Sequence, residues 1–359
     1  MRSRLTGRQL IIADGDYRAV VTAVGATLRT FRHRDEDLVD GFGADEVPEA
    51  GHGQVLAPWP NRLRDGAWTW AGERLLLPVD EPTKGNSASH GLVRRLTWTV
   101  IAHDCRRLRM HCVLNPQPGY PFRLDLIADY RVDEIDGLSA SITARNIGTR
   151  AAPVALGAHP YLRPPGGGLI DHSMVRVPAA TRMLPDARGI PYGRESVAGT
   201  DFDLRTLRRV GALAVNDAFC DLERDMDGRV QVQLTGSDGR CVVLTAGPSC
   251  RWLQVYTGDG LTPARRRRSM AIEPMTAPAG ALESGLGITV LAPGESMTLD
   301  WSISVAPGEP TKLPRLRRAN LPTPSVQPPT IASAARATGA GTVAGHPPET
   351  GRSGPPVAP

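Results

Sequence analysis

The feature that most constrains the fold of this chain is a period of two in its apolar residues. Over residues 123–133 apolar and charged side chains alternate, except at Ile127, without interruption by a turn residue. Alternation of this kind sends successive side chains to opposite faces of a strand, so that one face is buried and the other is wet. The same pattern recurs over residues 229–234 and, after the turn Pro293-Gly294-Glu295, over residues 297–305. No long window has the 3.6-residue period of an amphipathic helix, and the sequence therefore predicts strands.

Further strands are expected over residues 20–31, 68–78, 97–102, 108–114 and 138–146. Short apolar segments separated by Gly, Pro, Asp and Asn turns are typical of antiparallel sheets packed face to face. We therefore predict an all-β fold, a large antiparallel β-sandwich. The chain has 359 residues, and no linker-like break divides the first part of it, so residues 1–307 are expected to form one domain.

Residues 308–359 differ in composition from the rest, being rich in Pro, Ala, Gly, Thr and Ser. Such a segment cannot bury enough apolar surface to offset the entropy of ordering it, so we predict a disordered C-terminal tail. Six basic and two acidic residues between 309 and 359 account for four of the five net positive charges of the chain. The predicted domain is therefore close to neutral, which does not favour a polyanionic partner.

One dense basic run, Arg265-Arg266-Arg267-Arg268, lies inside the predicted domain. It could contact nucleic acid or a phosphate, although runs of this kind are more often solvated loops. Aromatic residues that would stack on bases do not interleave with it. We expect no nucleic-acid partner, and steep salt-dependent binding to DNA would support the alternative.

Several other classes of protein are disfavoured by simple counts. The sequence has no run of about 18 apolar residues, so no membrane span is predicted. The basic start Met1-Arg2-Ser3-Arg4 is followed by an apolar stretch, residues 10–13, that is far too short for a signal peptide. The five cysteines are odd in number and lack CxxC spacing, which argues against a disulfide framework or a zinc site. We expect a cytoplasmic protein with no metal and no cofactor.

The strongest single candidate for chemistry is Glu273, which lies between Ala271-Ile272 and Pro274-Met275. Apolar neighbours should desolvate this carboxylate and raise its pKa toward the working range of a general base. Two histidines are the next candidates. His159 follows the apolar run 154–158 and precedes a proline that restricts the chain, whereas His90 lies in a polar loop before Gly91. Either could be an ordinary loop histidine, but histidine is the commonest acid–base residue.

Two further segments offer groups that could bind a polar ligand. Arg62, in the proline-bounded loop 58–66, has a planar fork of donors suited to vicinal hydroxyls or a carboxylate, or to a surface salt bridge. Asp217 caps the apolar stretch 215–219, where its alternative role is an Asx turn.

Taken together, these motifs resemble the aldose 1-epimerase (galactose mutarotase-like) family, from about residue 25 to about residue 295. The resemblance implies a β-supersandwich in which Glu273 is the general base and His159 donates a proton to the ring oxygen of a sugar. It also assigns sugar binding to a group of residues spread over the chain, namely Asn61, Arg62, His90, Tyr161, Asp217 and Gln254, with Tyr256 nearby.

The implied reaction is the interconversion of the α and β anomers of a hexose through the open aldehyde. The resemblance implies no metal, nucleotide or covalent intermediate, a small-molecule sugar as partner, and a monomer or weak dimer. A positioned acid or base contributes about 10² to 10⁴ in rate.

The sequence departs from the best-known members of the family at three places and leaves the sugar open. Ala158 stands where an asparagine precedes the histidine, His90 stands alone where histidines are often paired, and Gly280 replaces an asparagine or aspartate. The segment His90-Gly91-Leu92-Val93-Arg94-Arg95 is similar to relatives that act on charged sugars. Arg94 or Arg95 could meet an anionic group or be a surface charge.

Three alternatives therefore stay open at this point. One is a mutarotase of an anionic sugar, such as a sugar phosphate or sulfosugar. Another is a noncatalytic carbohydrate-binding protein, although the aromatic content of 5% offers few stacking platforms. The third is a glycoside hydrolase in which Asp217 and Glu273 form the carboxylate pair.

Overall fold

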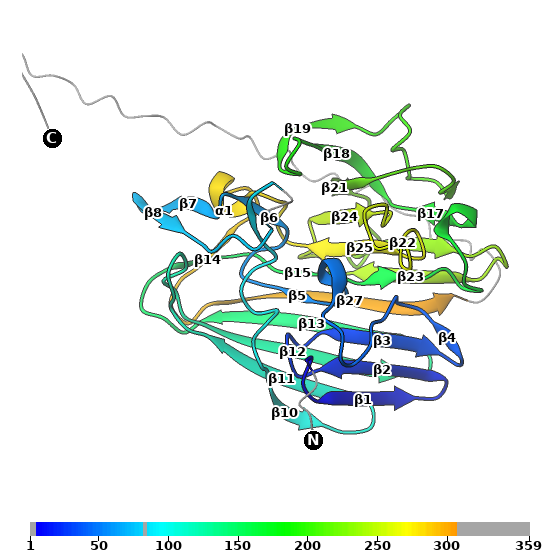
Figure 1. Ribbon diagram of the computed structural model, residues 1–359, viewed down its shortest axis with the longest axis horizontal. Helices are drawn as coiled ribbons and strands as arrows, with labels where there is room; N and C mark the ends of the chain where they lie inside the picture. The colour runs from blue at the N-terminus through cyan, green and yellow to red at the C-terminus, as the bar shows by residue number, and fades with distance from the viewer. Residues whose placement is uncertain (1–4, 82–84, 307–359) are drawn as a thin grey trace, which may run out of the picture. The chain divides into compact units, whose positions relative to one another are not determined.

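The computed structural model describes residues 5–81 and 85–306, which are built almost entirely from strands (Figure 1). Within these ranges the helical elements are the short helix α1 (Ala281–Ser284) and the 3₁₀ turns η1 (Glu49–Gly51) and η2 (Ile170–His172). None of the helices in the described ranges is long and apolar enough to cross a membrane. The predicted tail, residues 308–359, lies outside the described residues.

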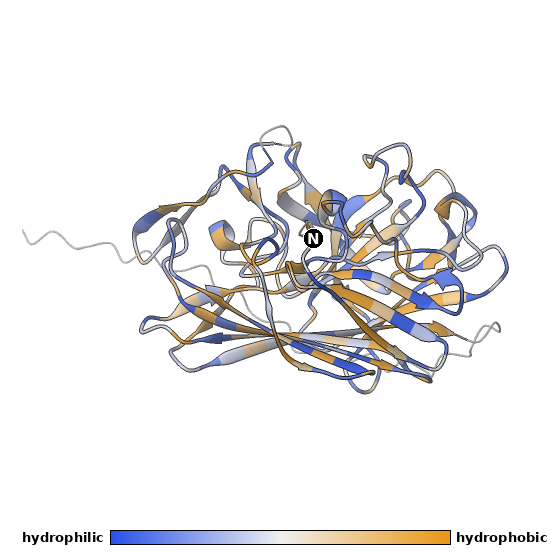
Figure 2. Cartoon of the chain, turned by 60° about the horizontal axis from the view of Figure 1, so that its bottom comes forward, coloured by the Kyte–Doolittle hydropathy of each residue, from blue (hydrophilic) through white to orange (hydrophobic). Residues whose placement is uncertain are grey.

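The largest sheet has nine antiparallel strands and contains the segments with the clearest alternation. Its residues alternate between buried and solvent-facing along β12, β13 and β22, and Figure 2 shows hydrophobic and hydrophilic residues alternating along the strands. In sheet order its strands are β10 (Thr99–His103), β11 (Arg107–Leu114), β12 (Leu124–Asp133), β13 (Gly137–Asn146), β27 (Ser296–Ala306), β23 (Cys241–Ala246), β22 (Val230–Thr235), β17 (Met174–Arg176) and β20 (Arg208–Arg209).

A second sheet of eight strands holds the segment around Glu273 at its centre. Its strands in order are β19 (Pro191–Ser196), β18 (Ala179–Pro185), β21 (Asn216–Leu222), β24 (Trp252–Tyr256), β25 (Met270–Met275), β15 (Gly157–Ala158) and β5 (Val55–Leu56), with β16 (Tyr161–Leu162) also paired to β25.

The remaining strands form one four-stranded sheet and three two-stranded ribbons. The four-stranded sheet consists of β1 (Gln9–Asp14), β2 (Tyr17–Thr22), β3 (Leu28–His33) and β4 (Glu36–Asp37). The ribbons are β6 (Arg62–Arg64) with β9 (Ser87–Ser89), β7 (Ala67–Trp70) with β8 (Glu73–Leu76), and β14 (Ala152–Val154) with β26 (Thr289–Leu291).

One continuous core joins the three larger sheets. Val21 of the four-stranded sheet, Leu126 of the nine-stranded sheet and Leu253 of the eight-stranded sheet belong to the same cluster of buried side chains. Strands β1 and β2 contact β12 directly. This packing of antiparallel sheets face to face confirms the predicted all-β sandwich.

The predicted segments correspond to six strands of the nine-stranded sheet, β10, β11, β12, β13, β22 and β27, whereas β17, β20 and β23 were not predicted and two predicted segments elsewhere are divided. Residues 20–31 form parts of two strands, β2 and β3, and residues 68–78 form most of the hairpin β7–β8. The reason is a tight turn in each segment: Ala26 has φ 46°, and Ala71 and Gly72 have φ 49° and 83°. Two successive residues of positive φ make the turn that matches the twist of a β-hairpin.

Candidate active site

Pro160 and Pro274 interrupt the backbone hydrogen bonds between strands beside Glu273, which leaves space for side chains there. Glu273 lies on β25, and the neighbouring strand on one side is divided into β15 and β16, with His159 and Pro160 between them. Neither Pro160 nor Pro274 has an N–H to donate, so regular pairing cannot continue through this point. The backbone of His159 pairs instead with the preceding loop, donating to Gln54 O at 3.1 Å and accepting from Gly53 N at 2.8 Å.

Glu273 and His159 face each other at the floor of a cavity. Nε2 of His159 lies 3.3 Å from Oε1 of Glu273, and the two residues are only 4% and 2% exposed, respectively. Oε2 of Glu273 and Nδ1 of His159 are buried and have no hydrogen-bond partner among the described residues. A buried acid–base pair with unused polar atoms is suited to bind and exchange protons with a ligand.

Burial favours the uncharged form of both members of this pair. It raises the pKa of Glu273 well above its usual value, and the charge of Arg62 opposes that change only in part. It also lowers the pKa of His159 to about 3, and the electrostatic effects of the neighbouring His52, Arg94 and Arg62 act in the same direction. The expectation of a desolvated Glu273 agrees with this direction, and groups whose pKa values are moved apart in a cavity are typical of catalytic sites.

His90 and Asn61 form the adjoining wall through mutual backbone contacts. The N–H of His90 donates to Asn61 O at 2.9 Å, and the N–H of Asn61 donates to Nδ1 of His90 at 3.2 Å. Nδ1 is therefore an acceptor, so a neutral His90 carries its proton on Nε2. Both residues have φ 58°, a left-handed conformation that non-glycine residues adopt at some cost and that is common at functional sites.

The cavity has a volume of 490 Å³ and is strongly polar. Arg62 lies in its wall, where Nε donates to Oε2 of Glu81 at 2.8 Å. Arg94 pairs with Asp80, and the mostly exposed Arg95 lies 3.7 Å from the same carboxylate. Six of the predicted site residues line this cavity together: Asn61, Arg62, His90, His159, Tyr161 and Glu273.

The structure does not bring Asp217 to the cavity. Asp217 pairs with Val255 across the strands, whereas Gln254 pairs with Glu273, so the register places Asp217 on the opposite face of the sheet from Glu273. There its Oδ2 accepts a hydrogen bond of 2.7 Å from Nε of Arg182. The preceding residue, Asn216, lines the cavity instead.

Gln254 contacts a residue of the cavity wall without lining the cavity itself, and Asn216 and Tyr256 are part of that wall. Nε2 of Gln254 donates to Oδ1 of Asn216 at 2.9 Å, but Gln254 itself is not among the lining residues. Tyr256 lies opposite Asn216 across the strand pair and also lines the cavity. A one-residue shift in register inverts every side chain, so the motif around residues 215–219 could not distinguish Asn216 from Asp217 without the pairing partner.

Sequence reasoning also missed His52, which is fully buried behind Tyr161. The rings of His52 and Tyr161 are stacked with centroids 3.6 Å apart, and Tyr161 is stacked on His159 with centroids 5.0 Å apart. The only local signal was a short Gly-His-Gly segment, residues 51–53, which does not stand out from an ordinary turn.

The spacing of His90, His159 and Glu273 would also suit a metal ion. One ligand atom from each residue lies within 4.8 Å of the others. A histidine binds a metal through a ring nitrogen with a free lone pair. The lone pair on Nδ1 of His90 already accepts a hydrogen bond from the Asn61 N–H. The remaining nitrogen then holds the ring proton, so the residues present fit a hydrogen-bonding site better than a metal site.

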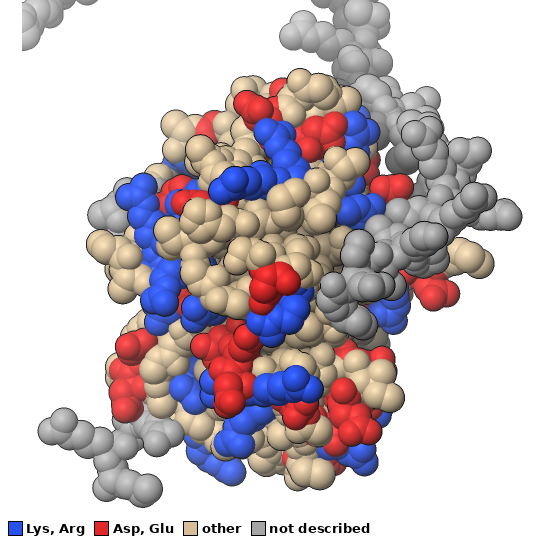
Figure 3. All heavy atoms as spheres, turned by 90° about the vertical axis from the view of Figure 1, so that its right-hand side faces the viewer, with Lys and Arg blue, Asp and Glu red and all other residues tan. Residues whose placement is uncertain are grey.

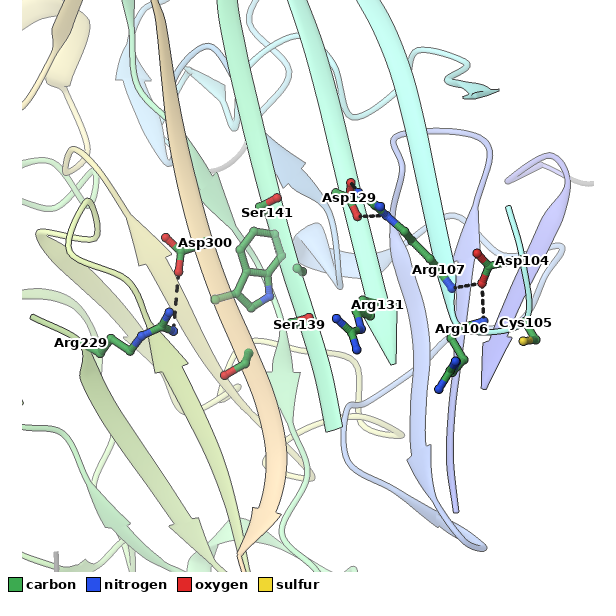
Figure 4. Close-up of a pocket in the computed structure, with 13 residues that line it drawn as sticks. Asp104, Cys105, Arg106, Arg107, Asp129, Arg131, Ser139, Ser141, Arg229 and Asp300 are labelled. Carbon is green, nitrogen blue, oxygen red and sulfur yellow. Dashed lines mark hydrogen bonds and ion pairs between the residues drawn. The ribbon is translucent and has the colours of Figure 1, made fainter. Parts of the chain in front are cut away.

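A larger hollow of 630 Å³ lies on the outward face of the nine-stranded sheet (Figure 4). Four of its charged side chains are paired with one another: Arg107 contacts Asp129 at 2.6 Å, and Arg229 lies 3.8 Å from Asp300. None of the residues that line this hollow form a facing pair of acid and base like Glu273 and His159. The smaller cavity around Glu273 is therefore the better candidate for chemistry.

The arginine run at residues 265–268 divides into two structural and two exposed residues. Arg265 contacts Asp40 at 3.1 Å, and Arg267 contacts Asp171 and Asp259 at 2.6 and 2.7 Å. Arg266 and Arg268 are exposed. On the face shown in Figure 3, basic and acidic side chains are interspersed and do not gather into a patch of one sign.

Comparison with known proteins agrees with this fold and site. The family model for aldose 1-epimerase matches residues 8–304, and the chain therefore belongs to the aldose 1-epimerase family. Among curated proteins, the uncharacterized protein YihR of Escherichia coli strain K12 is 29% identical over 298 residues, which cover 83% of this chain and 93% of YihR.

Solved structures with the same fold have more distant sequences. A GalM/aldose epimerase homologue from C. elegans superposes with a TM-score of 0.73 at 18% identity, covering 83% of this chain and 98% of the other. Galactose 1-epimerase from Lactobacillus acidophilus NCFM gives a TM-score of 0.68 at 20% identity, covering 82% and 92%. These likenesses establish the galactose mutarotase-like fold.

Proposed function

We propose that this protein is a mutarotase that interconverts the α and β anomers of a hexose, with Glu273 as base and His159 as acid. The observation that supports this most is the 3.3 Å separation of Oε1 of Glu273 from Nε2 of His159. A cyclic sugar has two oxygens on its anomeric carbon, the hydroxyl and the ring oxygen. An acid and a base this close together can address two oxygens that share one carbon.

In the proposed cycle, Glu273 accepts the proton of the anomeric hydroxyl while His159 donates a proton to the ring oxygen. The bond between the anomeric carbon and the ring oxygen breaks, and the open aldehyde forms. Rotation about the adjacent carbon–carbon bond presents the other face, and the reverse transfers close the ring. Arg62, His90 and Asn216 line the cavity and would hold the hydroxyls during this rotation.

The buried environment suits a cycle in which one proton moves between two partners. Before ring opening the pair is a carboxylate and an imidazolium, and after it the pair is a carboxylic acid and a neutral imidazole. Because burial raises the pKa of Glu273 and lowers that of His159, the uncharged pair that accompanies the open aldehyde is favoured. The same burial also favours the uncharged pair before a sugar binds, so the carboxylate–imidazolium pair that starts the cycle is a minor form of the free site.

The same geometry disfavours the hydrolase alternative. A glycosidase needs a second catalytic carboxylate about 5 to 9.5 Å from the first. Asp217 faces away from the cavity, and Asp80 and Glu81 are held by Arg94 and Arg62. A hydrolase would also leave His159 without a role in the reaction.

An anionic sugar is a second candidate substrate, supported by the arginines of the cavity. The side chain of Arg95 is 69% exposed, and the carboxylate it faces at 3.7 Å is shared with Arg94. Arg95 could therefore contact a phosphate or sulfonate on a bound sugar without losing a strong ion pair.

Polarimetry with freshly dissolved pure anomers tests the proposal and its substrate class together. We expect faster approach to equilibrium with glucose or galactose, or with a hexose 6-phosphate or 6-sulfonate if the sugar is anionic. In the latter case Arg95→Gln should raise KM about tenfold or more for the charged sugar and leave neutral sugars unaffected. Binding of all these sugars without acceleration would favour the noncatalytic alternative, and release of reducing sugar from a glycoside would favour a hydrolase.

A further inference from the structure

A second, smaller pocket adjoins the cavity around Glu273 and shares part of its wall. Its volume is 170 Å³, whereas a pocket that holds a whole small molecule usually has about 300–1,000 Å³. The small pocket is therefore of a size to hold one substituent of a ligand that lies in the larger cavity. The residues that line both are Asp80, Ser89, Arg94 and Arg95.

The boundary between the cavity and the small pocket lies close to the acid–base pair. Ser89 directly precedes His90, whose ring centroid is 5.2 Å from that of His159. The N–H of Ser89 donates to Oδ1 of Asp80 at 2.8 Å, which holds this carboxylate at the boundary. A sugar whose anomeric carbon lies between Glu273 and His159 can therefore place a substituent of its ring in the small pocket.

The wall of the small pocket combines apolar surface with a donor that has no acceptor. Leu92, Ala88 and Pro78 supply apolar side chains. Trp59 also lines the pocket and is 2% exposed, and its Nε1 is buried without a hydrogen-bond partner among the residues that the structure describes. The large majority of buried polar side-chain atoms in folded proteins have a partner, so this indole N–H points to an acceptor that a ligand brings.

Asp80 supplies an acceptor at the boundary of the pocket. Its Oδ1 accepts the N–H of Ser89, and its Oδ2 forms an ion pair with Arg94. An ionised carboxylate has about four lone-pair sites, so Asp80 can accept a further hydrogen bond from a ligand. A group that uses the whole pocket therefore needs a donor for Asp80, an acceptor for Trp59 and an apolar part.

An acetamido group has these three parts in a small volume, namely an amide N–H, a carbonyl oxygen and a methyl group. A hydroxyl would leave the apolar wall without a contact. A phosphate or sulfonate would bring a charge against apolar side chains and the carboxylate of Asp80, which is costly, and it is better placed outside the pocket beside the exposed Arg95. The chemistry of the pocket therefore favours an acetamido substituent.

We propose that the small pocket is a subsite for the acetamido group of an N-acetylhexosamine, and that the protein prefers this class of sugar to an unsubstituted hexose. Asp80 accepts the amide N–H, the indole of Trp59 donates to the carbonyl oxygen, and Leu92 packs against the methyl group. The inference rests on the proposed mutarotase function for its effect on rate, whereas binding of the acetamido group does not depend on catalysis.

Mutarotation rates test the effect on catalysis. The value of kcat/KM is measured for N-acetylglucosamine, N-acetylmannosamine and N-acetylgalactosamine and for the three parent hexoses. We expect at least one acetamido sugar to exceed its parent hexose by about tenfold or more. If the parent hexoses are accelerated and none of the acetamido sugars exceeds its parent, the proposal is wrong.

Two variants locate the preference within the pocket. Trp59→Phe removes the indole N–H and keeps an aromatic ring, whereas Leu92→Trp fills the pocket from its own wall. Both should bring the ratio of kcat/KM for the acetamido sugar and its parent close to one. Leu207→Trp is the matched control that should keep the wild-type ratio, because Leu207 is exposed and lines neither the cavity nor the small pocket. A wild-type ratio in both pocket variants would refute the placement of the acetamido group.

NMR titration of the wild-type protein with the same six sugars separates this inference from the proposed function and needs no variant to fold. Binding of an acetamido sugar about tenfold tighter than its parent, with no sugar accelerated, would support the subsite and refute the mutarotase. Acceleration of the hexoses, with no gain in Kd or kcat/KM for any acetamido sugar, would refute the subsite and leave the mutarotase standing. Absence of both acceleration and preferential binding would refute both.

Discussion

At the scale of single residues, the site depends on a carboxylate that burial disfavours as an ion. The pKa of Glu273 is raised in the folded protein, so the folded state holds this proton more tightly than the unfolded chain does. Its contribution to stability is therefore present below the unfolded pKa of about 4.5 and is lost as pH rises through the folded value. The folded protein is therefore less stable at working pH because Glu273 is buried in the cavity.

This reasoning predicts that Glu273→Gln is more stable than the wild type at neutral pH while being inactive. An amide of the same shape cannot ionise, so the gain should grow by about 1.4 kcal/mol per pH unit between the unfolded and the folded pKa of Glu273, and it should vanish toward pH 4. Thermal unfolding as a function of pH measures both quantities. A variant less stable than wild type at every pH would contradict the assigned direction.

Gly51 is the second residue whose effect can be predicted, because it lies against the ring of His159. A Cβ at Gly51, which has φ 80°, would lie 2.6 Å from Cδ2 of His159. Gly51→Ala should cost about 1–2 kcal/mol for the left-handed backbone and should also lower kcat about 10²-fold by displacing the imidazole. Gly199→Ala is the matched control, since Gly199 has φ 76° and nothing within 4 Å of its added Cβ. Equal activity of the two variants would rule out the contact as the cause.

At the scale of elements, the loop between β24 and β25 is held by the inner arginines of the run 265–268. Arg267 donates to Asp171, Asp259 and two backbone carbonyls, and its side chain is 12% exposed. We predict that Arg267→Gln costs about 1.5–3 kcal/mol in urea unfolding, as expected when hydrogen bonds from a charged donor are lost at a partly buried site. Arg266→Gln, the exposed neighbour, should change stability by no more than about 0.5 kcal/mol. Similar losses of stability in both variants would contradict the assignment of Arg267 as structural and Arg266 as exposed.

The elements also show what could and could not be predicted from sequence. Alternation identified β12, β13, β22 and β27, because each has one face in the core and one in water. The same reasoning predicted β2 and β3 as one strand, and β7 and β8 as another. The tight turn inside each pair is too short to interrupt the apolar pattern visibly. Local motifs found Glu273 and His159 by their apolar flanks and following prolines, although only His159 lies at a strand end and Glu273 lies within β25. They could not separate Asn216 from Asp217 or find His52, since those roles depend on register and on stacking between distant segments.

At the scale of the whole molecule, everything that forms the cavity lies before the predicted tail. The lining residues fall between Pro48 and Glu273, and the family match ends at residue 304. We therefore predict that a chain ending at residue 307 keeps the unfolding midpoint and any mutarotase activity of the full chain. Loss of either on truncation would show that residues 308–359 contribute to the fold or the site. The prediction of a monomer or weak dimer can be checked on both chains by analytical ultracentrifugation.

The measurement that tests the central claim most directly is two-dimensional exchange NMR of a sugar at equilibrium, in which cross-peaks between the α and β anomeric signals report their interconversion. The account predicts strong cross-peaks with the wild type and with Glu73→Gln, an exposed control on β8. Their intensity should fall to the uncatalysed level with Glu273→Gln, a loss of about 10² to 10⁴ in rate. Undiminished exchange in Glu273→Gln would contradict the assignment of the buried glutamate and histidine as the acid–base pair.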